Sequence, residues 1–277
     1  MPLKKSVLIT GCSNGIGLAV AKGLQNEFHV IATARKLDDV KSLTESGFDT
    51  VQLDLANEQS IEVGFQKVLA LTDGKIYGLF HNAGYAQIGA IEELPTKALI
   101  EQFQINFFSW HHLTRLVMPI MREQNEGRII FNSSMSGLVA GQFNGAYTAT
   151  KHALEGYADT LRHELYISKL NVHVSLLEPG PVESKIRGNA VSHFEHHIDP
   201  SNSPYQLAYG VVQKNLHSKS WKWHFTLPAS SCIKPVKHAL ESKNPKARYP
   251  VTIHTRLFSF LHRLLPTKAF DIAAFIL

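Results

Sequence analysis

Tyr147 and Lys151 are the two side chains with the clearest potential for chemistry. They lie four residues apart in residues 146–168, where the apolar spacing predicts a helix, so both face the same side. A tyrosine phenol titrates near ~10, and a neighbouring ammonium lowers its pKa by favouring the phenolate. Such a phenol can give a proton to a carbonyl oxygen or accept one from an alcohol. A structural helix pair has the same spacing, so other residues must decide between the two interpretations.

Three glycines mark a candidate phosphate-binding turn. Gly11, Gly15 and Gly17 fall in residues 10–17 (TGCSNGIG), after a predicted strand and before a predicted helix. Glycine permits unusual backbone angles and lets a pyrophosphate approach the backbone at a helix N-terminus. The run therefore predicts a dinucleotide site, and a tight strand-to-helix turn without a ligand is the alternative.

The surrounding elements must position these residues. Short β-branched runs alternate with helical periodicity. Strands are predicted at residues 6–10, 30–34, 50–53, 76–81, 128–132 and 171–177, and helices at 16–26, 60–71, 97–123 and 146–168. This alternation implies an α/β fold, a Rossmann-type doubly wound parallel sheet with helices on both faces. No repeat or linker divides the chain, so residues 1–277 are expected to form a single domain.

Composition narrows the class of protein. The chain has 277 residues, of which 44% are hydrophobic and 18% charged, and this excludes disordered and fibrous classes. Its two cysteines, Cys12 and Cys232, form no ligand-spaced cluster, so we expect no disulfide scaffold and a reducing cytoplasmic location. The net charge of +5 comes without a Lys/Arg block, so no nucleic-acid partner is expected. We also expect no signal peptide and no spanning helix.

Further motifs follow the glycine-rich turn in a fixed order. They are Asn82-Ala83-Gly84 after the fourth strand, Asn106 in the first long helix, Ser134 before the Tyr147/Lys151 pair, and Pro179-Gly180 after the sixth strand. Together with the glycine-rich turn, this set resembles the classical short-chain dehydrogenase/reductase family. The resemblance covers residues 6–184 and extends to NADP-dependent 17β-hydroxysteroid and retinol dehydrogenase-like members and to aldehyde-reducing members.

The resemblance implies that the catalytic residues are Asn106, Ser134, Tyr147 and Lys151. Tyr147 would be the acid/base, and Lys151 would tune it and bind the ribose hydroxyls. Ser134 would orient the substrate oxygen, and Asn106 would support a water relay through a local backbone irregularity. Ser133 and Ser136 are competitors, but the offset of thirteen residues before Tyr147 favours Ser134.

The resemblance also implies a set of cofactor-binding residues. They are Gly11, Ser13, Asn14, Gly15, Ile16, Gly17, Arg35, Asp54, Leu55, Asn82, Ala83, Gly84, Tyr147, Lys151, Pro179, Gly180, Val182 and Ser184. NAD-selective enzymes usually place an acid at the end of the second strand, where this chain has Ala34 followed by Arg35 and Lys36. Arginine can donate two hydrogen bonds to the 2′-phosphate of NADP(H), so NADP(H) is the expected cofactor. The alternative is that Arg35 and Lys36 are solvated loop charges that bind no cofactor.

Residues 1–184 are expected to form the cofactor-binding and catalytic core, and residues 185–277 a variable substrate lid and C-terminal segment. Helical patterns recur there at residues 235–243 and 255–265. The cluster His193, Glu195, His196, His197 lacks a supporting cysteine, so no metal is expected. Residues 255–277 are basic and aromatic. They either pack over the substrate site or a subunit partner, which we favour, or make a peripheral contact with an anionic membrane.

The sequence thus predicts an NADP(H)-dependent oxidoreductase that transfers hydride between nicotinamide and a carbonyl or alcohol. Reduction of an apolar aldehyde or ketone is the favoured reaction, with a small-molecule substrate and a homodimer or homotetramer built on residues 97–123 and 146–168. Two alternatives stay open: an NADP+-dependent dehydrogenase of steroid- or retinol-like alcohols, and a non-catalytic NADP-binding sensor or interaction protein. A fold alone does not name the substrate.

Overall fold

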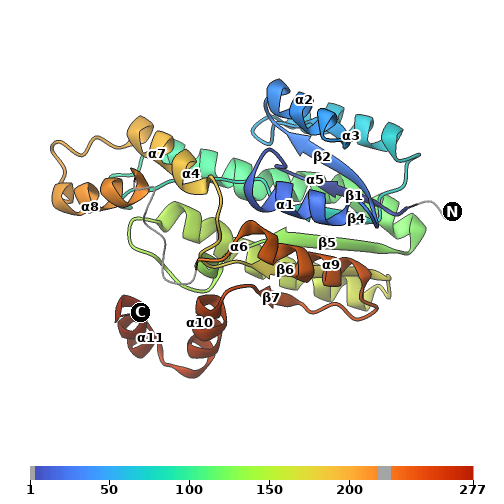
Figure 1. Ribbon diagram of the computed structural model, residues 1–277. Coiled ribbons are helices and arrows are strands. Elements are labelled where there is room, and N and C mark those ends of the chain that lie inside the picture. Colours follow the sequence, from blue (N-terminus) through green and yellow to red (C-terminus); the bar gives the residue numbers. More distant parts are fainter. Residues whose placement is uncertain (1–3, 218–225, 277) are drawn as a thin grey trace.

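A single parallel sheet forms the centre of the protein (Figure 1). The computed structural model describes residues 4–217 and 226–276, and within them seven strands take the order β3-β2-β1-β4-β5-β6-β7. The strands are β1 (Ser6–Ile9), β2 (His29–Ala34), β3 (Asp49–Gln52), β4 (Gly78–His81), β5 (Gly127–Asn132), β6 (Val172–Glu178) and β7 (Arg248–Pro250). The strand order reverses between β1 and β4, and sheets of this type bind ligands at the carboxyl ends of the strands beside such a reversal.

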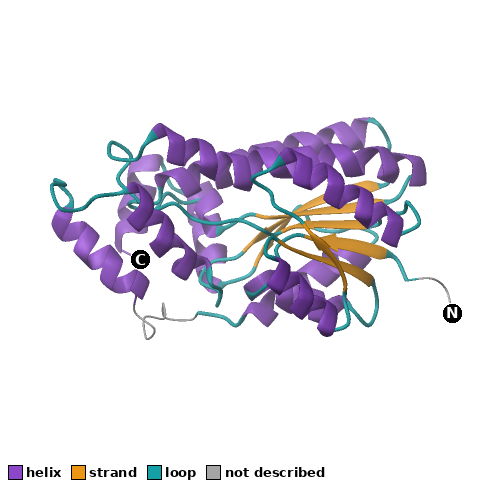
Figure 2. Ribbon diagram, turned by 90° about the horizontal axis from the view of Figure 1, so that it is seen from above, coloured by secondary structure: helices purple, strands orange, loops and turns teal. Residues whose placement is uncertain are grey.

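Helices cover both faces of the sheet (Figure 2). They are α1 (Gly15–Leu24), α2 (Leu37–Glu45), α3 (Glu58–Leu71), α4 (Thr96–Phe103), α5 (Ser109–Gln124), α6 (Gly145–Ile167), α7 (Ile186–His197), α8 (Gln206–His217), α9 (Ile233–Glu241), α10 (Ile253–Leu264) and α11 (Thr267–Ile276). Three short helical segments complete the list: a π-helix η1 (Gln104–Phe108) and the 3₁₀ turns η2 (Met135–Gly137) and η3 (Ala229–Cys232). The chain ends lie on opposite sides of the molecule.

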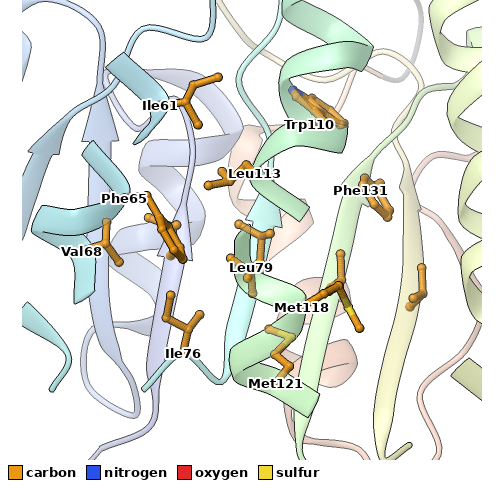
Figure 3. Packing of buried hydrophobic residues seen from close by; sticks show 14 of the residues in the cluster. Ile61, Phe65, Val68, Ile76, Leu79, Trp110, Leu113, Met118, Met121 and Phe131 are labelled. Atoms are coloured by element: carbon orange, nitrogen blue, oxygen red, sulfur yellow. The ribbon is translucent and has the colours of Figure 1, made fainter. Parts of the chain in front are cut away.

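The strand period of two divides the core into two layers. In β1, Leu8 packs into one cluster with α3, α5 and α6, while Val7 and Ile9 pack into the other with α1, α2 and α9. Figure 3 shows the first cluster, where Phe65 of α3 and Leu113 of α5 meet around Leu79 of β4. Because both faces are buried, the strands read as continuous apolar runs in the sequence.

The fold class predicted from the sequence is confirmed, and each predicted strand is present within one or two residues of its expected bounds. The helix predicted over residues 97–123 is divided into α4, η1 and α5. The backbone irregularity expected near Asn106 is confirmed, since this residue lies in the π-helix. Strand β7 was not predicted. It is three residues long and contains Arg248 and Pro250. An edge strand tolerates a proline, but a run this short has no apolar alternation from which a strand could be predicted.

Candidate active site

The glycine-rich turn joins β1 to α1 and leaves the start of that helix open. Gly11 and Gly15 have φ angles of 72° and 57°, the left-handed region that favours glycine. A Cβ on Gly17 would overlap the carbonyl oxygen of Gly11, so only glycine fits where the helix crosses the turn. The Asn14 side chain makes no capping hydrogen bond to the first N–H groups of α1, and such a helix start can bind an anion.

A cleft of about 580 Å³ opens at the carboxyl ends of the strands, beside this turn. Most of the predicted cofactor residues line it: Gly11, Ser13, Asn14, Gly15, Ile16, Arg35, Asp54, Leu55, Asn82, Ala83, Gly84 and Ser184. The lining runs from β2 across β1 to β4, which is the span that a dinucleotide needs in this type of fold.

Asn82 connects the three strands around the cleft. Its Nδ2 donates to the carbonyl oxygens of Thr10 (2.9 Å) and Gly11 (3.0 Å), and its Oδ1 accepts from Asn132 Nδ2 at 2.9 Å. The backbone N–H groups of Asn82 and Ala83 both donate to Thr10 Oγ1. The side chain thus holds the glycine-rich turn at a fixed position relative to β4 and β5.

Tyr147 lies in the first turns of α6, next to Ser134 at the start of η2. Burial raises the pKa of Tyr147 to about 12, and the neighbouring Ser134 hydroxyl partly opposes this rise. The expectation that Lys151 lowers the pKa of Tyr147 is therefore wrong for the protein alone, because desolvation dominates. The phenol is consequently protonated at neutral pH.

Lys151 lies next to the cleft and contacts it through Asn132. Its Nζ donates to the carbonyl oxygen of Asn132 at 2.6 Å, and Asn132 lines the cleft. The ammonium lies 4.7 Å from the Trp110 ring centroid and 5.4 Å from that of Tyr147. Burial lowers the pKa of Lys151 to about 7, while Glu155 one helical turn later opposes the change. A buried amine between two rings and a backbone carbonyl has a fixed position relative to Tyr147.

Asn106 is fully buried in the π-helix and faces the loop after β4. Its Oδ1 accepts from the backbone N–H of Tyr85 at 3.1 Å, and its Nδ2 donates to the Tyr85 carbonyl oxygen at 2.9 Å. A Cβ on Gly84 would come within 2.9 Å of Asn106 Oδ1. The amide therefore fixes the segment that carries Asn82, Ala83 and Gly84 at the cleft.

The neighbouring serines have different partners. Ser133 Oγ donates to Glu155 Oε1 at 2.5 Å and is buried, so it is occupied within the core. Ser134 Oγ accepts from the backbone N–H of Ser136 at 3.1 Å and adjoins Tyr147. Of the two, Ser134 has the hydroxyl beside the phenol, which agrees with the choice made from its offset to Tyr147.

Six predicted cofactor residues lie outside the cleft lining: Gly17, Tyr147, Lys151, Pro179, Gly180 and Val182. Gly17 is buried beneath the turn, and Pro179 accepts a backbone hydrogen bond from Met135 at 2.8 Å. Gly180 packs against Thr252, and Val182 forms an isolated bridge with Leu227. These residues connect the end of β6 to the elements around the site.

The cleft also has lining residues that the sequence did not reveal. Helix α7 begins one residue after Lys185 and contributes Asn189, Ser192 and His193. The His193 ring stacks on Tyr85 with centroids 3.9 Å apart, which joins α7 to the loop after β4. A weak apolar period hid this helix, because only Ala190 and Phe194 are buried on it. The i, i+4 spacing of that pair was the one available signal.

The His and Glu side chains at residues 193–197 of α7 do not converge on one site. His197 Nε2 lies 3.3 Å from Glu101 Oε2, and the His196 and His197 rings meet edge to face at 4.5 Å. Within residues 4–217 and 226–276, no three His, Cys, Asp or Glu side chains are grouped to hold a metal ion. In the same residues, no helix is both long and apolar enough to span a bilayer.

Comparisons with known proteins agree with this geometry. Residues 5–194 match the family model described as short chain dehydrogenase. An uncharacterised oxidoreductase of Escherichia coli, YbbO, is 39% identical over 97% of this chain and 93% of its own. The NADPH-dependent 3-dehydrocapnine reductase of Ornithobacterium rhinotracheale is 30% identical over 95% of this chain and 94% of its own.

The solved structures give the same result. A short-chain dehydrogenase/reductase from Burkholderia phymatum, in complex with NAD, superposes with a TM-score of 0.76 at 25% identity, covering 95% of this chain and 92% of that one. The family uses nicotinamide cofactors and acts on alcohol and carbonyl groups. With its glycine-rich turn, its cleft and the matched residues, the chain belongs to the short-chain dehydrogenase/reductase family of oxidoreductases.

Proposed function

We propose that the protein is an NADP(H)-dependent reductase of apolar aldehydes or ketones, with Tyr147 as proton donor. The observation that carries this proposal is the placement of Ser134 beside Tyr147 and of Lys151 Nζ on the carbonyl oxygen of Asn132, a residue that lines the cleft. A bound nicotinamide would supply the hydride. The protein contributes the proton, the orientation of the carbonyl and the binding of the ribose.

Tyr147 can act as the proton donor that the reductive direction requires. Its pKa of about 12 keeps the phenol protonated, and carbonyl reduction needs a proton donor at that position. Ser134 presents a second hydroxyl to the same oxygen. Lys151 supports the phenolate that remains after the transfer, and Asn106 holds the adjoining loop and connects Lys151 to a water relay.

The choice of NADP(H) rests on Arg35 and Lys36. Both line the cleft at the carboxyl end of β2, where Ala34 stands in place of an acid. Asp39, Asp54 and Lys185 also line the cleft, so three cations and two carboxylates leave its lining net positive. A guanidinium pairs with a phosphate through two hydrogen bonds, whereas a ribose hydroxyl offers no charge to bind. The NADPH-dependent relative from Ornithobacterium rhinotracheale supports the same cofactor.

Apolar substrates are proposed from the side chains near Ser134 and Tyr147. Met135, Leu138 and Val139 follow Ser134 and pack against α10 and α11. Phe143 precedes Tyr147 and contacts Tyr205 and Tyr209 at the start of α8. We assign residues 1–184 to the cofactor-binding and catalytic core and residues 185–277 to the substrate segment. Strand β7 and helix α9, however, contribute to the sheet layers.

The same proposal assigns the protein to the cytoplasm, with residues 255–277 packed over the substrate site or a subunit partner and a peripheral membrane contact as the alternative. A homodimer or homotetramer through α4, α5 and α6 is part of it. Ile100 of α4 and Phe108 of η1 are apolar, 60% and 49% exposed, and available to such an interface.

Turnover of Tyr147→Phe tests the proposal. With NADPH and a panel of apolar aldehydes and ketones, we expect the rate to fall at least 100-fold while the NADPH dissociation constant stays within about threefold. Tyr166→Phe is the matched control, because that ring is 85% exposed, and it should keep full activity. Unchanged turnover in Tyr147→Phe, or NADPH binding without turnover of any carbonyl in the wild type, would contradict the reductase and favour a sensor.

A further inference from the structure

The two C-terminal helices have one face that packs on the protein and one that does not. Phe258 of α10 and Phe270 of α11 are buried, their ring centroids are 6.3 Å apart, and they pack with Val139 beside η2. Thr252 accepts from the backbone N–H of Thr255 and caps the start of α10. The helix pair is therefore fixed to the protein, and its outer face has a defined direction.

The outer face of α10 is an apolar stripe. Ile253, Leu257, Phe260 and Leu264 are 65%, 40%, 62% and 64% exposed, and their spacing of four, three and four residues aligns them along one side of the helix. Ile272 of α11 is 61% exposed. Figure 1 shows this helix pair at the edge of the molecule, away from α1, α2 and α3. We call the four α10 residues the outer stripe.

The charged side chains of α10 itself have one sign. Arg256, Arg263 and, in α11, Lys268 are exposed, and residues 253–270 contain no aspartate or glutamate, although the exposed Asp271 follows in α11. Arg256 and Arg263 are seven residues apart, so both lie on the same flank of the stripe. Long basic side chains beside an exposed apolar stripe can reach lipid headgroups while the stripe enters the acyl boundary.

We propose that the outer stripe of α10 docks the protein onto an anionic bilayer surface. The arginines would contact phosphate headgroups, and the stripe would lie in the plane of the interface. A second copy of the chain is a poorer occupant. An antiparallel two-fold interface through this stripe would bring Arg256 and Arg263 onto the same side as the same residues of the other copy. The proposal gives a surface and a lipid class to the membrane contact named under the proposed function, and it does not depend on hydride transfer.

Vesicle flotation of the full chain tests the proposal. The probes are vesicles of phosphatidylcholine alone and of phosphatidylcholine mixed with phosphatidylglycerol, at low and high salt. We expect the wild type to float with the anionic vesicles at least tenfold more than with the neutral ones, and to lose this preference at high salt. Arg256→Gln/Arg263→Gln should reduce the preference for anionic vesicles, and Leu257→Ser/Phe260→Ser should reduce flotation at least tenfold.

Leu207→Ser/Val211→Ser is the matched control. These side chains are 89% and 60% exposed on α8 with the same four-residue spacing, and their replacement should leave flotation unchanged. Each variant should retain NADPH binding, which separates a failure of docking from a failure of the proposed reaction. The proposal is overturned if the wild type floats equally with both vesicles or if the stripe variant floats like the wild type. It is also overturned if light scattering finds a dimer that only the stripe variant lacks.

Discussion

The cofactor side of the molecule and its C-terminal third differ in how well their structure can be predicted from short sequence motifs. From β1 to β5, the cleft is built by residues close to each strand end, and Asn82 alone joins β1, β4 and β5. Both regions depend on contacts between residues distant in sequence, such as Asn82 with Thr10 and Arg248 of β7 with Glu155 of α6. They differ because the first region has short motifs at its strand ends that can be recognised in the sequence, while the contacting residues of the second region have no such motif.

The two regions meet behind the catalytic residues. Glu155 accepts from Ser133 at 2.5 Å and from Arg248 Nε at 3.0 Å, and Arg248 also donates to Asp159 at 2.8 Å. Glu178 lies fully buried nearby, with its Oε1 3.3 Å from Arg248 Nε but neither oxygen accepting a hydrogen bond from a described residue. A cluster of carboxylates around one arginine thus couples β7 to the loop that carries Ser134.

The largest effect is expected for Gly17→Ala on the cofactor side. The new methyl would overlap the Gly11 carbonyl oxygen and lie 2.5 Å from Asn82 Nδ2, so the turn must move. We expect NADPH affinity to fall at least 100-fold and the free energy of unfolding to drop by about 1–3 kcal/mol. Fluorescence titration and urea unfolding measure the two changes. Wild-type affinity in this variant would mean that the turn is not the phosphate site.

Glu155→Ala tests the connection between the regions. It leaves the buried Ser133 hydroxyl without its acceptor and removes one partner of Arg248, so we expect a loss of about 2–4 kcal/mol in urea unfolding. Glu164→Ala on the same helix is exposed and should change stability by less than about 0.5 kcal/mol. Equal results for the two variants would show that the C-terminal third is an independent lid.

Glu178→Gln tests whether the free energy of unfolding depends on pH through this buried carboxyl. Burial raises the pKa of Glu178 to about 8, with Glu155 adding to the rise. The folded state then holds a proton that the unfolded state has released, so wild-type stability should fall as pH rises from the usual carboxyl range through about 8. The variant lacks this group, and its slope should be flatter by up to about 1.4 kcal/mol per pH unit. Urea unfolding at pH 5.5 and 8 measures it, and parallel slopes would mean that Glu178 is ionised against Arg248.

The smallest effect is expected for Gly210→Ala in α8, the counterpart of Gly17→Ala. Among the residues that the structure describes, no atom outside its own helix backbone lies within 4 Å of the position of its Cβ, so the methyl adds helix propensity without a clash. A gain of about 0.5–1 kcal/mol should appear as a higher unfolding midpoint with unchanged NADPH affinity. Destabilisation would show that α8 is packed more tightly than its exposure indicates.

Sequence reasoning was sufficient where local patterns specify the structure. The strands, the turn and the order of the matched motifs all follow from short runs, so the sheet and most of the cleft lining were predictable. It failed for β7, which is three residues long, and for α7, whose buried residues are few. It also missed the sign of the Tyr147 pKa shift, because burial depends on elements far away in the chain. Contacts such as His193 with Tyr85 have no local signature.

The most direct test is a fluorescence titration of the wild type and Arg35→Ser with NADPH and NADH. Because charge-assisted hydrogen bonds contribute about 1.5–3 kcal/mol, we predict that the wild type binds NADPH at least tenfold more tightly than NADH. Arg35→Ser should lose most of that ratio, while Arg122→Ser, exposed at the end of α5, should keep it. Equal affinities in the wild type, or tighter NADH binding, would contradict the assignment of Arg35 and with it the proposed NADP(H)-dependent reductase.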